Sequence, residues 1–86
     1  MKDFFYIYIL ECSDGRWYTG YTKDLENRLS EHQNGKVQST KLRLPVKIIY
    51  FEGCRNQQDA THREKYLKTT YGKRYIRTRN NGYFTG

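Results

Sequence analysis

Two short runs of hydrophobic residues near the start of the chain are separated by a turn signal. Residues 4–10 are almost all aromatic or β-branched, which is typical of a buried strand. Ser13-Asp14-Gly15 is a turn sequence, and residues 16–21 return to a strand-like composition. The pattern therefore predicts a β-hairpin.

The length of the hairpin loop decides which side chains share a face of the sheet. A three-residue loop with Gly15 in the left-handed conformation pairs Tyr8 with Gly20 and places Tyr8 and Tyr18 on one face. A two-residue loop formed by Asp14 and Gly15 would instead put the two tyrosines on opposite faces. We expect the three-residue loop, with Gly20 leaving space beside the Tyr8 ring.

Helix signals alternate with a third strand in the rest of the chain. Asp24 can cap a helix that runs to about residue 33, where Asn34-Gly35 stops it. The composition of residues 46–51 predicts a third strand. Asn56 can then cap a helix that ends near residues 71–72. A last short helix is expected over residues 73–79. The order is ββαβα(α), an α/β domain over residues 1–79 with a C-terminal tail over residues 80–86.

Composition and charge narrow the class of protein. The chain has 86 residues, of which only 36% are hydrophobic, so nine Tyr and four Phe must supply much of the core. The formal net charge of +7 favours a polyanionic partner such as nucleic acid; a basic, solvated surface without a partner is the alternative. The first apolar run is too short to cross a bilayer, so we expect a cytoplasmic protein that binds no membrane.

Polar residues fall where the predicted helices should face the core. At 100° per residue, Arg28 and His32 share the inward side of the first helix with Leu25 and Leu29. A histidine in such a position is more often a hydrogen-bonded structural residue than a catalytic one. The motif tyrosines, taken alone, are likewise more often packing residues.

A carboxylate lies on the apolar stripe of the second helix. Glu64 falls in line with Ala60, Leu67 and Tyr71. One interpretation is an internal salt bridge between Glu64 and Arg28. The other is a cleft in which Glu64 binds a hard cation and Arg28 meets a phosphate group; one carboxylate can suffice for Mg²⁺, because this ion keeps several waters.

Basic and aromatic residues outside the predicted core could contact the partner. The cations expected to position a phosphate backbone are Lys36, Lys41, Arg43, Lys47, Lys73, Arg74 and Arg77. Aromatic residues interleaved with the later cations, Tyr75, Tyr83 and Phe84, could stack on unpaired bases. Disorder of the tail is the alternative for Tyr83 and Phe84.

Taken in order, these residues form a known pattern. Tyr6-Ile7-Tyr8, nine further residues and Tyr18-Thr19-Gly20 resemble the paired motif that names the GIY-YIG nuclease superfamily. The helix with Arg28 and His32, and Glu64 on a later helix, follow in the same order. The chain is most similar to the short stand-alone bacterial members that resemble the incision subunit of excision repair.

This resemblance implies a fold, an activity and residue roles. The fold is a small three-stranded antiparallel sheet flanked by helices, and the activity is metal-dependent hydrolysis of nucleic acid, with DNA favoured and low sequence specificity. Tyr8 and Tyr18 would lie at the reaction centre, with Tyr8 preferred as the group that deprotonates water. Arg28 would neutralise the phosphate, and His32 would assist proton transfer. A single Mg²⁺ or Mn²⁺ ion would bind Glu64, and Gly20 would be structural.

Three departures from the family pattern bear on activity. Tyr6 replaces the first Gly of the motif and Thr19 replaces Ile, and neither side chain would take part in the chemistry. The third concerns an Asn that family nucleases often carry after the glutamate helix, for which Asn80 and Asn81 are the candidates in this chain. A non-catalytic nucleic-acid-binding module with this fold, acting with a protein that selects the target, is therefore the alternative function.

The identity of the general base is open at this stage. An unperturbed tyrosine has a pKa of about 10 and is mostly protonated at pH 7. Either a nearby cation favours the phenolate of Tyr8, or His32 takes the proton.

Overall fold

The computed structural model describes residues 3–86, and it begins with the expected hairpin. Strands β1 (Phe5–Glu11) and β2 (Trp17–Thr22) pair antiparallel, with Tyr8 opposite Gly20. The loop is closed by a hydrogen bond of 2.8 Å from the Cys12 amide to the Arg16 carbonyl, and Gly15 has a φ of 81°. The three-residue loop with a left-handed Gly15 is therefore confirmed, and it sets the register.

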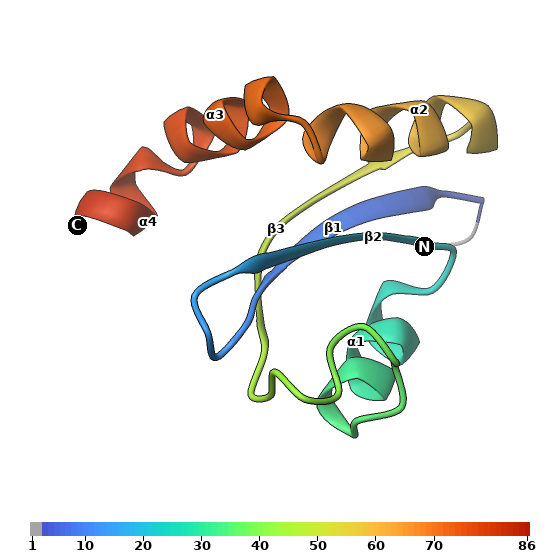
Figure 1. The fold of residues 1–86 in the computed structure, drawn as a ribbon. Helices are drawn as coiled ribbons and strands as arrows, with labels where there is room; N and C mark the ends of the chain where they lie inside the picture. Colours follow the sequence, from blue (N-terminus) through green and yellow to red (C-terminus); the bar gives the residue numbers. More distant parts are fainter. Residues whose placement is uncertain (1–2) are drawn as a thin grey trace.

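The sheet has three antiparallel strands, as the sequence and the family resemblance led us to expect. Strand β3 (Lys47–Cys54) pairs with β1, which gives the strand order β2-β1-β3. The pairing of β1 with β3 shifts register between Ile9 and Leu10. Figure 1 shows α1 on one side of this sheet and α2 and α3 on the other.

Helix α1 (Leu25–Gln33) begins and ends where its capping residues predict. The Asp24 side chain accepts a hydrogen bond of 3.1 Å from the Asn27 amide, which satisfies a free donor of the first turn. At the other end Asn34 is the C-cap, and Gly35 follows with a φ of 73°. The boundaries are encoded locally.

Helix α2 (Gln57–Leu67) begins at the predicted cap but ends earlier than expected. Asn56 accepts a hydrogen bond of 3.0 Å from the Asp59 amide. The predicted end near residues 71–72 is wrong, because Thr69 caps a new helix, α3 (Thr70–Arg79), by accepting a hydrogen bond of 3.1 Å from the Gly72 amide. Tyr71 consequently lies on α3 with 70% of its surface exposed, and not on an inward stripe of α2.

Gly72 allows the two helices to meet closely. A Cβ atom at this position would lie against the backbone of the last turn of α2, 2.8 Å from the Leu67 carbonyl carbon. Any larger residue would have to push the helices apart.

The segment beyond residue 79, expected to be a tail, contains the short helix α4 (Asn81–Thr85). Phe84 stacks on Trp17 with ring centroids 5.5 Å apart, and the Tyr83 hydroxyl donates a hydrogen bond of 2.9 Å to Glu11. These contacts attach residues 81–85 to the hairpin. The domain boundaries inferred from the sequence remain a prediction.

The two faces of the sheet support two hydrophobic clusters. Ile7 and Ile9 pack under α2 and α3, against Ala60, Leu67 and Ile76. The alternate residues of β1, among them Tyr8 and Leu10, face α1 and pack with its leucines, Leu25 and Leu29. Tyr8 is therefore on the α1 side of the sheet. Within residues 3–86, no helix has the length and apolar character that a membrane span requires.

Candidate functional site

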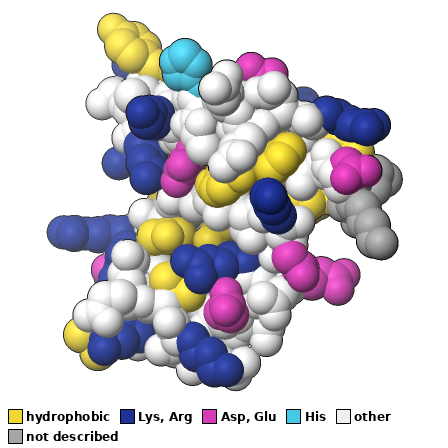
Figure 2. Space-filling view, turned by 90° about the vertical axis from the view of Figure 1, so that its right-hand side faces the viewer, with side chains coloured by type: hydrophobic (Ala, Val, Ile, Leu, Met, Phe, Trp, Pro, Cys, Tyr) yellow, Lys and Arg dark blue, Asp and Glu magenta, His cyan; other side chains and the backbone are white. Residues whose placement is uncertain are grey.

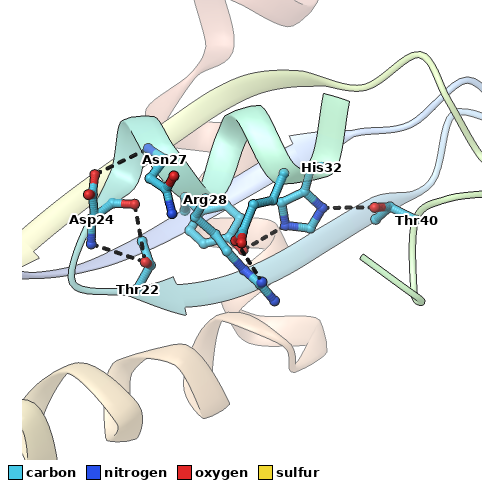
Figure 3. A network of polar contacts seen from close by, with 8 residues as sticks. Thr22, Asp24, Asn27, Arg28, His32 and Thr40 are labelled. Carbon is cyan, nitrogen blue, oxygen red and sulfur yellow. Dashed lines mark hydrogen bonds and ion pairs between the residues drawn. The ribbon is translucent and has the colours of Figure 1, made fainter. Parts of the chain in front are cut away.

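A buried chain of three polar side chains lies between β1, α1 and the loop that follows α1. The Tyr8 hydroxyl is 2.8 Å from His32 Nε2. On the other side of the ring, His32 Nδ1 is 2.8 Å from Thr40 Oγ1 (Figure 3). All three residues have at most 1% of their surface exposed. A neutral imidazole carries one N–H, so His32 donates at one of these contacts and accepts at the other.

Tyr18 completes an aromatic group around His32. Its ring centroid lies 5.0 Å from that of His32 and 6.2 Å from that of Tyr8. Tyr18 is opposite Leu10 in the β1–β2 ladder, so both tyrosines project from the same face. The register predicted from the hairpin loop produces this grouping.

Arg28 lies one helical turn before His32 and borders the buried chain. Figure 3 shows both side chains extending from the same side of α1. Arg28 Nη1 donates a hydrogen bond of 3.1 Å to Glu31, and 35% of the Arg28 side chain remains exposed. The guanidinium is thus fixed at one edge and accessible from solvent.

The environment sets the protonation states of this cluster. Burial raises the pKa of Tyr8 to about 12, although the neighbouring Arg28 opposes the shift. Burial, followed by the positive charge of Arg28, lowers the pKa of His32. The hydroxyl of Tyr8, followed by Glu31, raises the pKa of Arg28. At neutral pH the cluster therefore holds a protonated tyrosine, a neutral histidine and a cationic arginine.

Thr40 is a member of this cluster that the sequence interpretation did not identify. It lies in the basic loop after α1 that also carries Lys36 and Lys41, but the Thr40 side chain is fully buried. The loop turns inward through hydrogen bonds such as that of 3.1 Å from the Thr40 amide to the Val37 carbonyl. A hydroxyl eight residues after a buried histidine was the available signal, and it is a weak one.

Glu64 lies on the other side of the sheet. Its side chain is 20% exposed and pairs with Lys68 Nζ at 3.3 Å, one helical turn away on α2. Arg28 pairs with Glu31 instead, so the first of the two interpretations, an internal salt bridge between Glu64 and Arg28, is wrong. The structure thus assembles Tyr8, Tyr18, Arg28 and His32, and it leaves Glu64 outside their contacts.

The donor atoms available to a metal ion are few. In residues 3–86, no three side chains from His, Cys, Asp and Glu lie together as a ready-made ligand set. Such a set would be needed for a structural zinc site, whereas Mg²⁺ or Mn²⁺ can bind a single carboxylate and keep its waters. Glu64 fits that looser requirement once Lys68 moves away.

Arg63, the neighbour of Glu64, belongs to a different network. It binds Glu52 of β3 through two hydrogen bonds, of 2.7 and 3.2 Å, and Tyr50 donates a third bond of 2.6 Å to the same carboxylate. Burial opposes ionisation of Glu52, but the hydrogen bonds from Arg63 and Tyr50, together with the charge of Arg63, outweigh it and lower the pKa of Glu52. This pair joins α2 to the sheet.

Asn80, a candidate for the Asn that follows the glutamate helix in family members, contacts the backbone of the sheet. Its side-chain amide donates a hydrogen bond of 3.0 Å to the Ile49 carbonyl, and Asn80 is also the C-cap of α3. In this position it fixes the end of α3 against β3.

The predicted nucleic-acid-binding cations are distributed over several surfaces. Arg43, Lys73 and Arg77 line one cavity at the tip of the hairpin. Lys47 pairs with Glu11 at 3.6 Å and lies 5.3 Å from the Tyr83 ring centroid, while Lys36, Lys41 and Arg74 are exposed. Figure 2 shows Lys or Arg side chains next to hydrophobic ones across the middle of the face that it presents.

The aromatic residues expected to stack on bases already have partners. Phe84 stacks on Trp17, and Tyr75 lies under Arg63 with its ring centroid 4.7 Å from the guanidinium carbon. Tyr83 is held between Glu11 and Lys47, although 48% of its surface is exposed. Within the described chain, these rings stabilise the C-terminal helices.

Comparison with known proteins gives one family. The model of the GIY-YIG catalytic domain matches residues 4–83. A UPF0213 protein of Streptococcus agalactiae is 48% identical over 64 residues, which cover 73% of each chain. A UPF0213 protein of Haloquadratum walsbyi is 43% identical over 70 residues, covering 80% of this chain and 79% of the relative.

Two structures solved by NMR have a similar fold. One is a protein of E. faecalis with a TM-score of 0.62 and 32% identity, covering 99% of this chain and 92% of that chain. The other is a UPF0213 protein of Bacillus halodurans with a TM-score of 0.57 and 33% identity, covering 87% and 83%.

Proposed function

Because this chain belongs to the GIY-YIG catalytic-domain family, which is a nuclease family, we propose that it is a metal-dependent endonuclease. Its relatives are UPF0213 proteins. Its substrate would be nucleic acid, DNA in the first instance, cut at phosphodiester bonds with low sequence specificity. The observation that carries this proposal is the contact of 2.8 Å between the Tyr8 hydroxyl and His32 Nε2, beside the guanidinium of Arg28.

The contact between Tyr8 and His32 supports a proton relay. With a pKa of about 12, Tyr8 is protonated at neutral pH and is not a ready-made base. Neutral His32 can accept the Tyr8 proton at Nε2 while the phenolic oxygen takes a proton from the attacking water. This requires the tautomer in which Nδ1–H donates to Thr40, so Thr40 would position the ring of His32.

Arg28 would bind the phosphate that is cut. Its planar guanidinium can donate two parallel hydrogen bonds to the non-bridging oxygens of a phosphodiester. Glu31 now accepts one hydrogen bond from Arg28, and both side chains are about one-third exposed, at 35% and 38%. An incoming phosphate could therefore replace or share this contact. The added negative charge would also favour the protonated form of His32.

Glu64 would hold the single Mg²⁺ or Mn²⁺ ion. When bound, such an ion would supply positive charge to the leaving oxygen. Glu64 would have to exchange Lys68 for the ion, and the bound strand would have to reach from the Arg28 side of the sheet to α2. Gly20, on the edge strand β2, would be structural, because its missing side chain leaves the space that the Tyr8 ring fills.

The separation of Glu64 from the tyrosine cluster favours a second candidate function. A module that binds nucleic acid without cutting it needs the basic surface but not the carboxylate. In that case the pair between Glu64 and Lys68, with its contact of 3.3 Å, would be a plain helix-stabilising ion pair. A protein partner would then select the target.

The test is cleavage of branched, nicked and single-stranded DNA, and of RNA, in Mg²⁺ or Mn²⁺. Wild-type protein should cut at least one of these substrates, and chelation of the ion should stop it. Glu64→Gln should reduce the rate by about 10²-fold or more while binding is kept. The matched control, Glu26→Gln, removes an exposed carboxylate from the first turn of α1 and should cut normally. Binding without cleavage in wild type would favour the second candidate.

A further inference from the structure

A cavity of about 540 Å³ opens at the tip of the β1–β2 hairpin, away from the tyrosine cluster. Three separate parts of the chain contribute to it: the hairpin, the loop before β3, and α3. Its lining residues are Gly15, Arg16, Trp17, Arg43, Lys73 and Arg77. The cavity therefore exists only because the fold brings these segments together.

The lining is strongly cationic. Four of its six residues carry a positive charge, and none of the six is acidic. Asp14 pairs with Arg43 at 3.2 Å from outside the lining, and the backbone amide of Arg16 lowers the pKa of Asp14, so this carboxylate stays charged. One carboxylate against four cations leaves a clear positive surplus, which favours an anionic ligand.

Trp17 contacts one of these cations, Arg77, and does not present a free ring. Its centroid lies 4.8 Å from the guanidinium carbon of Arg77 and 5.5 Å from the centroid of the Phe84 ring, which stacks on it at 22°. Trp17 is thus occupied by two neighbours, and a nucleobase could not stack on it without displacing one of them. The chemistry that the cavity offers is recognition of phosphate rather than of bases.

The spacing along β2 relates this cavity to the proposed reaction centre. Arg16 precedes Gly20 by four residues, which is roughly 13 Å at the rise of a β-strand. That length corresponds to about four base-pair steps of a duplex. A strand that is cut next to Tyr8 and follows β2 would therefore pass the hairpin tip a few nucleotides from the cleaved bond.

We propose that the cavity at the hairpin tip is an anchoring site for backbone phosphates of nucleic acid, distinct from the Arg28 phosphate site. The inference rests on the proposed function in taking nucleic acid as the ligand, but it does not require cleavage. The cavity would add affinity without sequence preference and would fix the distance between the anchored phosphates and the cleaved bond.

Binding to a short DNA duplex, measured with a chelator present, tests the proposal. Lys73→Gln/Arg77→Gln removes two lining cations from one side of α3. Arg16→Gln/Lys73→Gln also removes two lining cations but keeps the contact of Arg77 with Trp17. It serves as the second variant if loss of that contact destabilises α3. The matched control, Lys65→Gln/Arg79→Gln, removes the same charge from exposed positions outside the cavity. Thermal unfolding checks that all variants are folded.

Both cavity variants should bind about tenfold more weakly than the control. The magnitude of the slope of log affinity against log salt concentration should also decrease by about 2, which is about 1 per lost phosphate contact. The proposal is overturned if cavity and control variants weaken equally, because binding would then follow net charge alone. It is also overturned if inorganic phosphate displaces the duplex at a concentration similar to that of the duplex itself. The cavity would then be a site for small anions.

Cleavage and anchoring can fail separately. If wild type cuts no substrate yet the cavity variants alone lose binding, the nuclease proposal fails and the anchoring site stands. If wild type cuts and the cavity variants bind as the control does, the anchoring site fails and the nuclease proposal stands.

Discussion

Gly20 lies directly across the β1–β2 ladder from Tyr8, and the Tyr8 ring fills the space that a side chain at position 20 would occupy. A Cβ atom on Gly20 would lie 2.8 Å from Tyr8 Cε1 and closer still to the end of the ring. This arrangement lets the hydroxyl of a fully buried tyrosine reach His32. The glycine is therefore part of the geometry of the site.

Gly20→Ala should destabilise the protein by about 1–3 kcal/mol, because the buried Tyr8 ring must move to accept the methyl group. Displacing the ring should also lengthen the contact between Tyr8 and His32, which NMR shifts of the imidazole would report. Gly82→Ala is the control, since a Cβ atom there meets nothing within 4 Å. Equal stability of the two variants would contradict the close packing.

Two tyrosine hydroxyls should respond in opposite ways to removal. Tyr21 has a buried hydroxyl without a hydrogen-bond partner among the described residues, so Tyr21→Phe should be neutral or stabilising by about 1 kcal/mol. Tyr8→Phe should cost about 1–3 kcal/mol, because it leaves His32 Nε2 without its partner. Denaturant unfolding at neutral pH measures both changes. A loss of stability in Tyr21→Phe as large as that in Tyr8→Phe would show that the Tyr21 hydroxyl has a partner.

The stability of the protein should fall as the pH drops below about 6.5. The unfolded chain binds a proton on His32 near that pH, whereas the folded protein, in which burial lowers the pKa of His32, does not. The contribution of His32 to the free energy of unfolding is therefore fully present above pH 6.5. It decreases by at most about 1.4 kcal/mol per pH unit until the pKa of His32 in the folded protein is reached.

Denaturant unfolding between pH 7.5 and about 5 measures this slope, above the range in which carboxylates titrate. His32→Gln should abolish it, although the variant is less stable at every pH. His62→Gln, at an exposed position on α2, should keep it. A slope unchanged in His32→Gln would mean that another group titrates.

Arg28→Lys should keep a positive charge but lose the planar fork that suits a phosphate. We expect cleavage to slow by about tenfold to 100-fold, with a smaller loss of binding. Single-turnover rates on a bound substrate separate the two effects. Arg79→Lys on the surface of α3 is the control and should behave as wild type. If Arg28→Lys also cuts at the wild-type rate, Arg28 does not contact the reacting phosphate.

Local signals explain which parts of the structure the sequence predicted. The turn with Gly15 fixed the hairpin register, and Asp24 and Asn56 marked the starts of α1 and α2. The side of α1 that carries Arg28 and His32 followed from helical periodicity alone. These features depend on residues close together in sequence, so pattern analysis could find them.

The parts that were missed depend on contacts between distant residues. The end of α2 was placed too late because Tyr71 continued the helical stripe, whereas the chain breaks where Gly72 packs on the preceding turn. Thr40 lies in a loop without periodicity, and the pair of Glu52 with Arg63 joins β3 to α2. Sequence spacing does not encode such partners.

The proposed mechanism requires the Tyr8 hydroxyl, hydrogen-bonded to His32, to take part in hydrolysis. The most direct measurement is the single-turnover cleavage rate of wild type and Tyr8→Phe, with substrate fully bound and at a temperature where both proteins are folded. We expect a rate at least about 100-fold lower in Tyr8→Phe, with similar affinity for the substrate. Equal rates in the two proteins would contradict it.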